Sequence, residues 1–345
     1  MRTTNKEFKT GKETLHSLVC LGEEKGKETF LKIVVLGLLG GLYIGFSGIQ
    51  VSITVGGSQS IRETNPGLAN FLFGGLFPIG FIISSVCGGD IFGNGILCLT
   101  TALLSKKVTF GKAVTNSIIT LVTNLIGSFL CSWLLTYKSD LLNEDPYNSW
   151  IISYSTKEVE EYFFVSFLKA VGGTYLIGLS LYLSVSANDI ISKIAAIWFP
   201  ILAFGALGFD HATVSMYFIS LGLLYKAPKI TFFRFLWHHL FPITLGNIIG
   251  SSIFVATIYF YLYYQKNEQP EILSKNKSRL EMELQEMAPL QNFNEEIDRM
   301  ENLYRIYRVR KVSSIIRPKS DNIERPIREI SSENTNISNF SSNTD

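Results

Sequence analysis

Charge is scarce in this 345-residue sequence: Asp, Glu, Lys and Arg make up only 17% of it, whereas 47% is hydrophobic. The charged residues lie mainly at the two ends and in a few short loops, so the long stretches between them carry almost none. The net charge of +2 is too small to indicate a nucleic acid partner. This distribution of charge is typical of a polytopic membrane protein embedded in a lipid bilayer.

Cysteine is also rare, and none of the four residues has a paired spacing. Three of them, Cys87, Cys98 and Cys131, lie in apolar runs, which favours buried thiols over a disulfide or metal-binding framework. We therefore expect no metal site, and we expect no cofactor. The first 30 residues are charged and lack the apolar core of a signal peptide, so we expect no cleavable leader.

What the sequence does contain is long apolar segments. A helix needs about 20 residues to cross a bilayer. Four of the six segments fit one crossing each, but the second and fifth are too long for a single helix. Each is interrupted by glycines, in GGDIFGNG (88–95) and GALGFDH (205–211), so we predict a break at mid-depth in both. Broken backbone at that depth must be buried in protein or line a wet cavity. The six segments are 33–55, 67–105, 113–137, 162–188, 194–225 and 240–264.

The chain repeats itself. LFPIGFIISSVCGGDIF in the second segment is similar to WFPILAFGALGFDHA in the fifth, and NLIGS in the third is similar to NIIGS in the sixth. Three crossings repeated once give the two halves opposite orientations. We therefore predict an all-α membrane protein of six transmembrane helices, arranged as an inverted 3+3 repeat with helices 2 and 5 broken.

Basic loops predict the orientation. Lysines and arginines in residues 1–30 and lysines in the loop 106–112 indicate the cytoplasmic side, and the acidic loop 138–161 indicates the outside; the basic loop 226–234 counts against this scheme. We expect a cytoplasmic N-terminal segment (1–30), a transmembrane transport domain (31–265) and a partly disordered cytoplasmic tail (266–345) that could contain amphipathic helices. The expected location is the plasma membrane, with both termini in the cytoplasm.

Asp210 and His211 lie side by side within the fifth apolar segment, where charge is expensive, so they form a functional-site hypothesis. The alternative is a core histidine bonded to a neighbouring carbonyl. An imidazole can donate to an anion and can change its charge near neutral pH. Asp210 could orient the ring or the loop, and Asp90, at the other break, is expected to cap the amides of its own loop. Aromatic constrictions beside a polar centre would exclude hydrated ions; the phenylalanines that flank the breaks are Phe77, Phe81, Phe92 and Phe204.

At these positions the sequence resembles the formate/nitrite transporter family, over residues 25–265. The matching stretches are DIFGN (90–94), GFDHATVSM (208–216) and PITLGNIIGS (242–251). The resemblance implies an aquaporin-like fold with broken helices 2 and 5, assembled as a homopentamer with one pore per subunit. Three residues depart from the usual family pattern: Gly93 for threonine, Asp210 for glutamate and Ser215 for asparagine.

The resemblance also implies roles for individual residues. The central pore histidine falls on His211, with Asp210, Asn94 and Ser215 beside it. The vestibular lysine falls on Lys157, or on the adjacent Glu158 if the alignment shifts by one residue. One constriction falls on Phe77 and Phe204 and the other on Phe81, Ile91 and Phe92, while loop support falls on Asp90, Asn124 and Asn247.

We therefore expect a channel-like transporter of small monocarboxylates, such as formate or lactate, with proton coupling, and not an enzyme. Its partners would be monocarboxylate anions, protons, the lipid bilayer and four further copies of the chain. One alternative is an aquaporin-type neutral-solute channel, although neither break carries an Asn-Pro-Ala motif. Another is an intramembrane aspartyl protease using Asp90 and Asp210, although residues 87–90 read Cys-Gly-Gly-Asp where that class has Gly-x-Gly-Asp.

Overall fold

The computed structural model describes residues 8–264 and 300–301. Within them every regular element is a helix, and no strand is present. The predicted tail, 266–345, lies outside the described residues except for Met300 and Glu301.

The first half of the chain consists of α1 (Gly11–Lys25), α2 (Phe30–Gly57), α3 (Gln59–Thr64), α4 (Pro66–Leu76), α5 (Pro78–Cys87), α6 (Phe92–Leu104), α7 (Phe110–Leu130) and the π-helical η1 (Cys131–Tyr137). The second half consists of α8 (Tyr147–Glu160), α9 (Phe163–Ser186), α10 (Ile190–Ala206), α11 (Ala212–Leu224), α12 (Phe232–Arg234), η2 (Phe235–Leu240), α13 (Phe241–Ile249), η3 (Gly250–Thr257) and α14 (Ile258–Tyr263).

Six crossings follow from these helices. Helices α10 and α11 have 17 and 13 residues, so neither spans a bilayer alone, but in series they make one crossing. Large apolar side chains such as Ile118, Leu168 and Phe199 are exposed on the helix surfaces, where lipid or another membrane helix would cover them. The five helical stretches that are long and apolar enough to cross alone are Phe30–Gly57, Pro66–Cys87, Phe110–Tyr137, Phe163–Ser186 and Phe232–Tyr263.

Both predicted breaks are confirmed. Helix α5 ends at Cys87 and α6 begins at Phe92, while α10 ends at Ala206 and α11 begins at Ala212. Gly88 and Gly208 take the left-handed conformation at these ends, with φ of 84° and 68°. A residue with a Cβ would be strained at either place, so glycine lets the chain leave the helix at each break.

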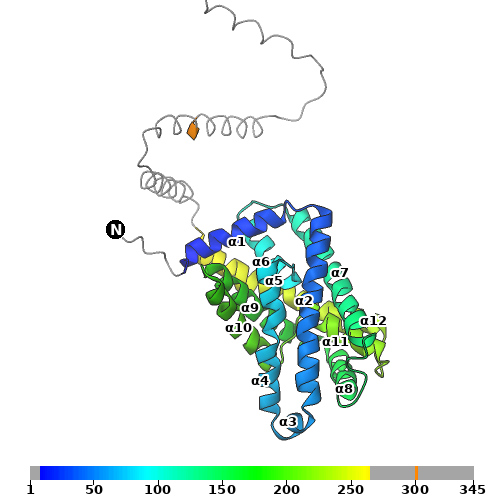
Figure 1. Cartoon of the computed structure of the whole chain (residues 1–345). Coiled ribbons are helices and arrows are strands. Elements are labelled where there is room, and N and C mark those ends of the chain that lie inside the picture. The colour runs from blue at the N-terminus through cyan, green and yellow to red at the C-terminus, as the bar shows by residue number, and fades with distance from the viewer. Residues whose placement is uncertain (1–7, 265–299, 302–345) are drawn as a thin grey trace, which may run out of the picture. The chain divides into compact units, whose positions relative to one another are not determined.

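The packing repeats in the two halves. Helix α2 packs along α7, and α9 packs along α13. Helix α1 lies across one end of the bundle, packed on α6 and α9, whereas α8 lies toward the other end and packs on α11 (Figure 1). The segment predicted as a cytoplasmic terminus therefore contributes a helix that contacts the transmembrane body.

All four cysteines are free thiols. Cys98 and Cys131 are buried, as expected, but Cys87 is exposed. The expectation of a buried thiol was wrong for Cys87 because this residue ends α5 beside Gly88, where the helix stops.

Candidate functional site

Asn124 of α7 holds the first broken loop in place. Its side-chain nitrogen donates to the carbonyls of Gly37 (2.8 Å) and Asp90 (2.7 Å), and its Oδ1 accepts the amide of Phe92 at 3.0 Å. Phe92 is the first residue of α6, so a side chain from another helix satisfies an N-terminal amide that would otherwise be orphaned. The Asn124 Oδ1 also accepts the hydroxyl of Thr213 at 2.9 Å, which links the first loop to α11.

Asn247 of α13 does the same for the second loop. Its Oδ1 accepts the amide of Ala212, the first residue of α11, at 2.9 Å. Its nitrogen donates to the carbonyl of Ala170 at 3.2 Å and to the hydroxyl of Thr174. The two asparagines thus hold the N-termini of two half-helices, and the positive end of each helix dipole is fixed at a broken loop.

His211 precedes α11 and is fully buried, with 0% of its surface exposed. Neither ring nitrogen has a hydrogen-bond partner among the described residues. A Cβ on Gly93 would lie 2.6 Å from Nε2, so this nitrogen faces the N-terminus of α6. The ring edge meets Phe81, with the centroids 6.5 Å apart. A buried imidazole with two unused nitrogens is the kind of exception that a bound ligand explains.

Gly93 leaves space for this histidine. With the ring where it lies, a threonine at position 93 would collide with Nε2 unless one of them moved. The carbonyl of Gly93 accepts the hydroxyl of Ser251 at 2.8 Å, so η3 also supports this loop. Asn94 is partly buried and its Oδ1 has no partner among the described residues, while Ser215 is 6% exposed and its amide donates to the His211 carbonyl at 3.0 Å.

Buried aromatic rings cover one side of the histidine. The ring of Phe77 lies 6.1 Å from that of Phe81 and 6.2 Å from that of Phe204, between centroids. Ile91 belongs to the same apolar cluster, whereas Phe92 belongs to a second cluster, with Ala212 and Met216. Phe81 thus lies between Phe77 and His211, and Phe77, Phe81 and Phe204 form one continuous group of rings.

The expectation that Asp90 caps the amides of its own loop was wrong. Its side chain instead accepts a charge-assisted hydrogen bond from Lys25, the last residue of α1. Asn124 provides the contact to the loop amide, so the carboxylate is available for the lysine. Burial disfavours the ammonium, but the Asp90 carboxylate outweighs this effect and raises the pKa of Lys25.

Asp210 is buried about as deeply as Asp90, with 6% of its surface exposed, but its neighbours differ from those of Asp90. Its carboxyl lies within hydrogen-bonding reach of the Glu158 carboxyl, on α8. Lys169 of α9 lies close enough to act on both acids, although its ammonium pairs with Glu161. Burial, and then the carboxylate of Glu161, raise the pKa of Glu158.

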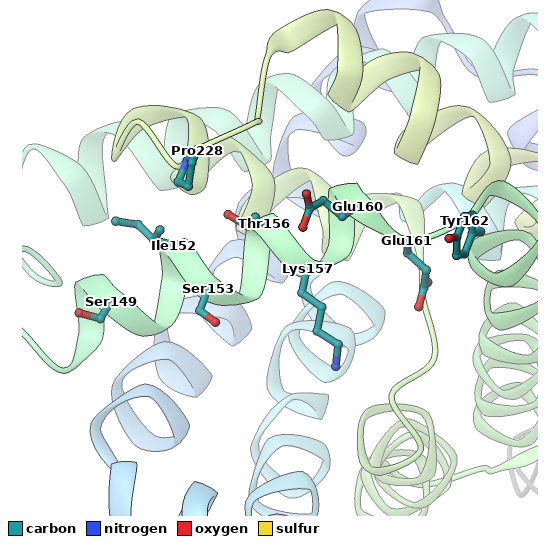
Figure 2. Close-up of a pocket in the computed structure, with 9 residues that line it drawn as sticks. All are labelled: Ser149, Ile152, Ser153, Thr156, Lys157, Glu160, Glu161, Tyr162 and Pro228. Atoms are coloured by element: carbon teal, nitrogen blue, oxygen red, sulfur yellow. The ribbon is translucent and has the colours of Figure 1, made fainter.

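Lys157 is exposed and lines a surface hollow between α8 and the loop at Pro228. Figure 2 shows Lys157 and Glu161 extending to one side of the helix and Glu160 to the other. No pore-centre residue lines this hollow. The structure therefore places Glu158, and not Lys157, in contact with Asp210.

Sequence reasoning gave no role to three groups at the site. Lys169 had a signal, since it is the only charged residue in its apolar segment. Lys25 and Thr213 had no such signal in the sequence. Lys25 lies among many charged residues near the N-terminus, and Thr213 is an ordinary hydroxyl residue within an apolar segment. Their roles depend on contacts between residues far apart in the chain.

Comparison with known proteins places this geometry in a family. Residues 12–261 match the family described as Formate/nitrite transporter. A probable formate transporter of Methanothermobacter thermautotrophicus is 31% identical over 75% of this chain and 98% of its own length. The formate channel BtFdhC of Bacillus thuringiensis is 28% identical over 71% of this chain and 92% of its own length.

Two solved structures share the fold. One is titled an FNT family ion channel, with a TM-score of 0.66, 22% identity, and coverage of 72% of this chain and 98% of that one. The other is titled a pentameric formate channel with formate bound, with a TM-score of 0.60, 21% identity, and coverage of 68% and 98%. The family match covers the helices, both broken loops and the two asparagines that hold them, and this integral membrane protein belongs to the formate/nitrite transporter family.

Proposed function

We propose that this chain is a proton-coupled, channel-like transporter of small monocarboxylates, with formate and lactate as the first candidates, and not an enzyme. The carrying observation is His211: it is fully buried, both ring nitrogens lack partners among the described residues, and two half-helices begin beside it. Relatives named as a formate transporter and a formate channel support the substrate class.

The proposed mechanism follows from the cost of charge in a membrane. The positive ends of α6 and α11 attract an anion to the pore centre, where the imidazole is a positioned donor. A charged monocarboxylate cannot pass the rings of Phe77, Phe81 and Phe204 cheaply, but the neutral acid can. The anion therefore takes up a proton near His211 and crosses as the acid. Lys157, exposed on α8, would add to the positive potential that concentrates anions on its side.

Three further statements belong to this proposal. The chain assembles as a homopentamer, which is supported by the pentameric state named for one solved structure of the same fold. It resides in the plasma membrane with both termini in the cytoplasm, which is supported by the basic residues of 1–30 and 106–112. The protease alternative loses support because Asp90 contacts Lys25 while Asp210 contacts Glu158, so the two aspartates form no dyad.

The test is uptake of labelled formate, lactate and nitrite into proteoliposomes between about pH 5 and pH 8. We expect monocarboxylate uptake that rises as the external pH falls. H211F should abolish it while assembly persists, because the ring keeps its approximate size but loses both nitrogens. H211N should retain weak uptake with less pH dependence. H238F is the matched control, since His238 is exposed on η2, and it should transport like the parent.

Two outcomes would contradict the proposal. If H211F transports like the parent with the same pH profile, His211 is only a core residue. If the parent passes neutral solutes such as glycerol but no monocarboxylate, the chain is a neutral-solute channel.

A further inference from the structure

The carboxyl of Asp210 lies against a second carboxyl, and no cation among the described residues forms an ion pair with it. The side chains of Asp210 and Glu158 lie within hydrogen-bonding reach of each other. An ionised carboxylate only accepts hydrogen bonds, so two ionised carboxylates cannot bond to each other and their charges repel. The contact becomes favourable when one of the two carries a proton.

The hydrogen bonding of Asp210 is incomplete within the part of the chain that the structure describes. Asp210 is 6% exposed, and its Oδ2 receives no hydrogen bond from any residue that the structure describes. A buried acceptor without a donor costs free energy. A proton held between the two carboxyls would provide the missing donor.

The charges around the pair do not balance it. Glu161, which precedes α9, brings a third carboxylate, and the ammonium of Lys169 pairs with it. Lys157 is exposed and its side chain lies in the surface hollow. Three carboxylates thus share two ammonium groups, Lys169 and the exposed Lys157, and burial raises the pKa of Glu158 although both lysines lower it.

Two uncharged groups complete the surroundings of Glu158. The hydroxyl-bearing ring of Tyr154 approaches from the same helix, and the buried ring of His239, on η2, lies beside the backbone of Glu158. Neither brings a fixed positive charge to the carboxyls.

We propose that Glu158 and Asp210 share one proton and form a proton-binding site on the α8 side of His211. The effect of this site on transport rests on the proposed function, whereas the existence of the site does not. With the proton bound the pair carries one negative charge, and without it two, which repel an approaching monocarboxylate. When the pair gives its proton to the anion, the neutral acid forms and the pair keeps both negative charges until solvent returns a proton.

The site can be detected without transport. A protonated carboxylic acid has an infrared C=O stretch that a carboxylate lacks. We expect this band in the purified parent at neutral pH and its loss at high pH. E158Q and D210N should each lose it, because either amide can donate to the carboxylate that remains. E160Q is the matched control, since Glu160 lies on the same helix and pairs with Lys229 at the surface, and it should keep the band.

Transport then measures the consequence. A single site changes its protonated fraction by up to about tenfold per pH unit above its pKa. We expect the ratio of formate uptake at low pH to that at neutral pH to fall roughly threefold or more in E158Q, and to stay unchanged in E160Q. E158K puts an ammonium opposite Asp210, as Lys25 stands opposite Asp90, and should raise uptake at neutral pH several-fold.

The outcomes separate the two proposals. A band that is present in the parent and lost in both variants supports the shared proton even if no monocarboxylate is transported, which would count against the proposed function alone. A parent that transports formate but has no such band, or whose pH profile is unchanged in E158Q, overturns the proton site. If a variant fails to assemble, the presence or absence of the band in the parent still tests whether a carboxyl is protonated.

Discussion

The two broken loops have nearly the same backbone support but opposite electrical surroundings. Asn124 and Asn247 each accept the first amide of a half-helix, and a glycine of α2 or α9 lies against the carbonyl of each loop aspartate. The partner of the carboxylate differs, however: Asp90 meets Lys25, and Asp210 meets Glu158. The inverted repeat therefore determines where the loops lie, while one residue on α1 or α8 determines the charge beside each loop.

This difference gives the two broken loops different chemistry. The Lys25–Asp90 pair joins opposite charges, and its lysine keeps its proton over the physiological range because the pKa of Lys25 is raised. The Glu158–Asp210 pair has no neutral state unless it binds protons. Under the proposed function, an anion would thus meet a balanced pair on one side and a pair whose charge depends on pH on the other.

The largest effect that we expect comes from breaking the balanced pair. K25M would leave the carboxylate of Asp90, which is 4% exposed, without its cation. Loss of one partner of a buried ion pair costs about 3 to 5 kcal/mol, because an uncompensated charge stays buried. Unfolding in detergent micelles would measure the loss, and K25M/D90N should recover most of it, since the amide carries no charge.

K27M is the matched control for that experiment. Lys27 pairs with Glu23 one turn away at the surface, where the lysine side chain is 65% exposed. Such a pair is worth about 0.5 kcal/mol or less. Equal losses in K25M and K27M would show that the Lys25–Asp90 contact contributes little to the fold.

Much of this comparison could be predicted from the sequence. The two long segments had to break because a single helix of that length is longer than the bilayer is thick. The glycines at 88–89 and 205–208 indicated where each break lies. The repeated NLIGS and NIIGS indicated that Asn124 and Asn247 have equivalent places. The lengths of the apolar segments, their glycines and the repeat predicted six crossings with two broken helices, and the family resemblance implied the aquaporin-like fold.

The partners of the loop carboxylates could not be predicted. Lys25 and Asp90 are 65 positions apart, and nothing near Asp90 in the sequence indicates a lysine. A capping role for Asp90 was the local expectation, and it was wrong because Asn124 takes the amide of Phe92. The choice between Lys157 and Glu158 depended on the rotation of α8 about its axis, which is set by packing on α11.

A second, smaller effect distinguishes the two asparagines. Asn124 makes four side-chain hydrogen bonds and Asn247 makes three. The additional bond at Asn124 comes from Thr213, in the other half of the repeat. N124A should therefore destabilise the protein by about 1 kcal/mol more than N247A, the net value of one buried hydrogen bond.

The variant T213V tests whether that bond is the cause. Valine keeps the branched shape but removes the hydroxyl. N124A/T213V and N247A/T213V should then unfold at similar denaturant concentrations. A persistent difference would place the asymmetry elsewhere in the two loops.

The smallest effect concerns the dependence of stability on pH, and it separates the two pairs by the pH range in which stability is lost. The pKa of Glu158 is raised above its usual value of about 4.5, so as the pH rises the unfolded state releases this proton before the folded state does. The stability from this group is complete below about pH 4.5 and is lost as the pH rises through the folded pKa. The pKa of Lys25 is raised from 10.5, so its contribution is complete below that pH and is lost only above it.

Of the two pairs, only Glu158–Asp210 should therefore change the stability between about pH 5 and pH 8. The parent should unfold at lower temperature as the pH rises, relative to E158Q, because the glutamine has no proton to release. The difference between parent and E158Q isolates this pair, since all other titrating groups are common to both. K25M should be less stable than the parent by the same amount throughout the range. If the difference between parent and E158Q is instead independent of pH, Glu158 and Asp210 do not share a proton, and the two halves of the pore differ in sequence but not in proton binding.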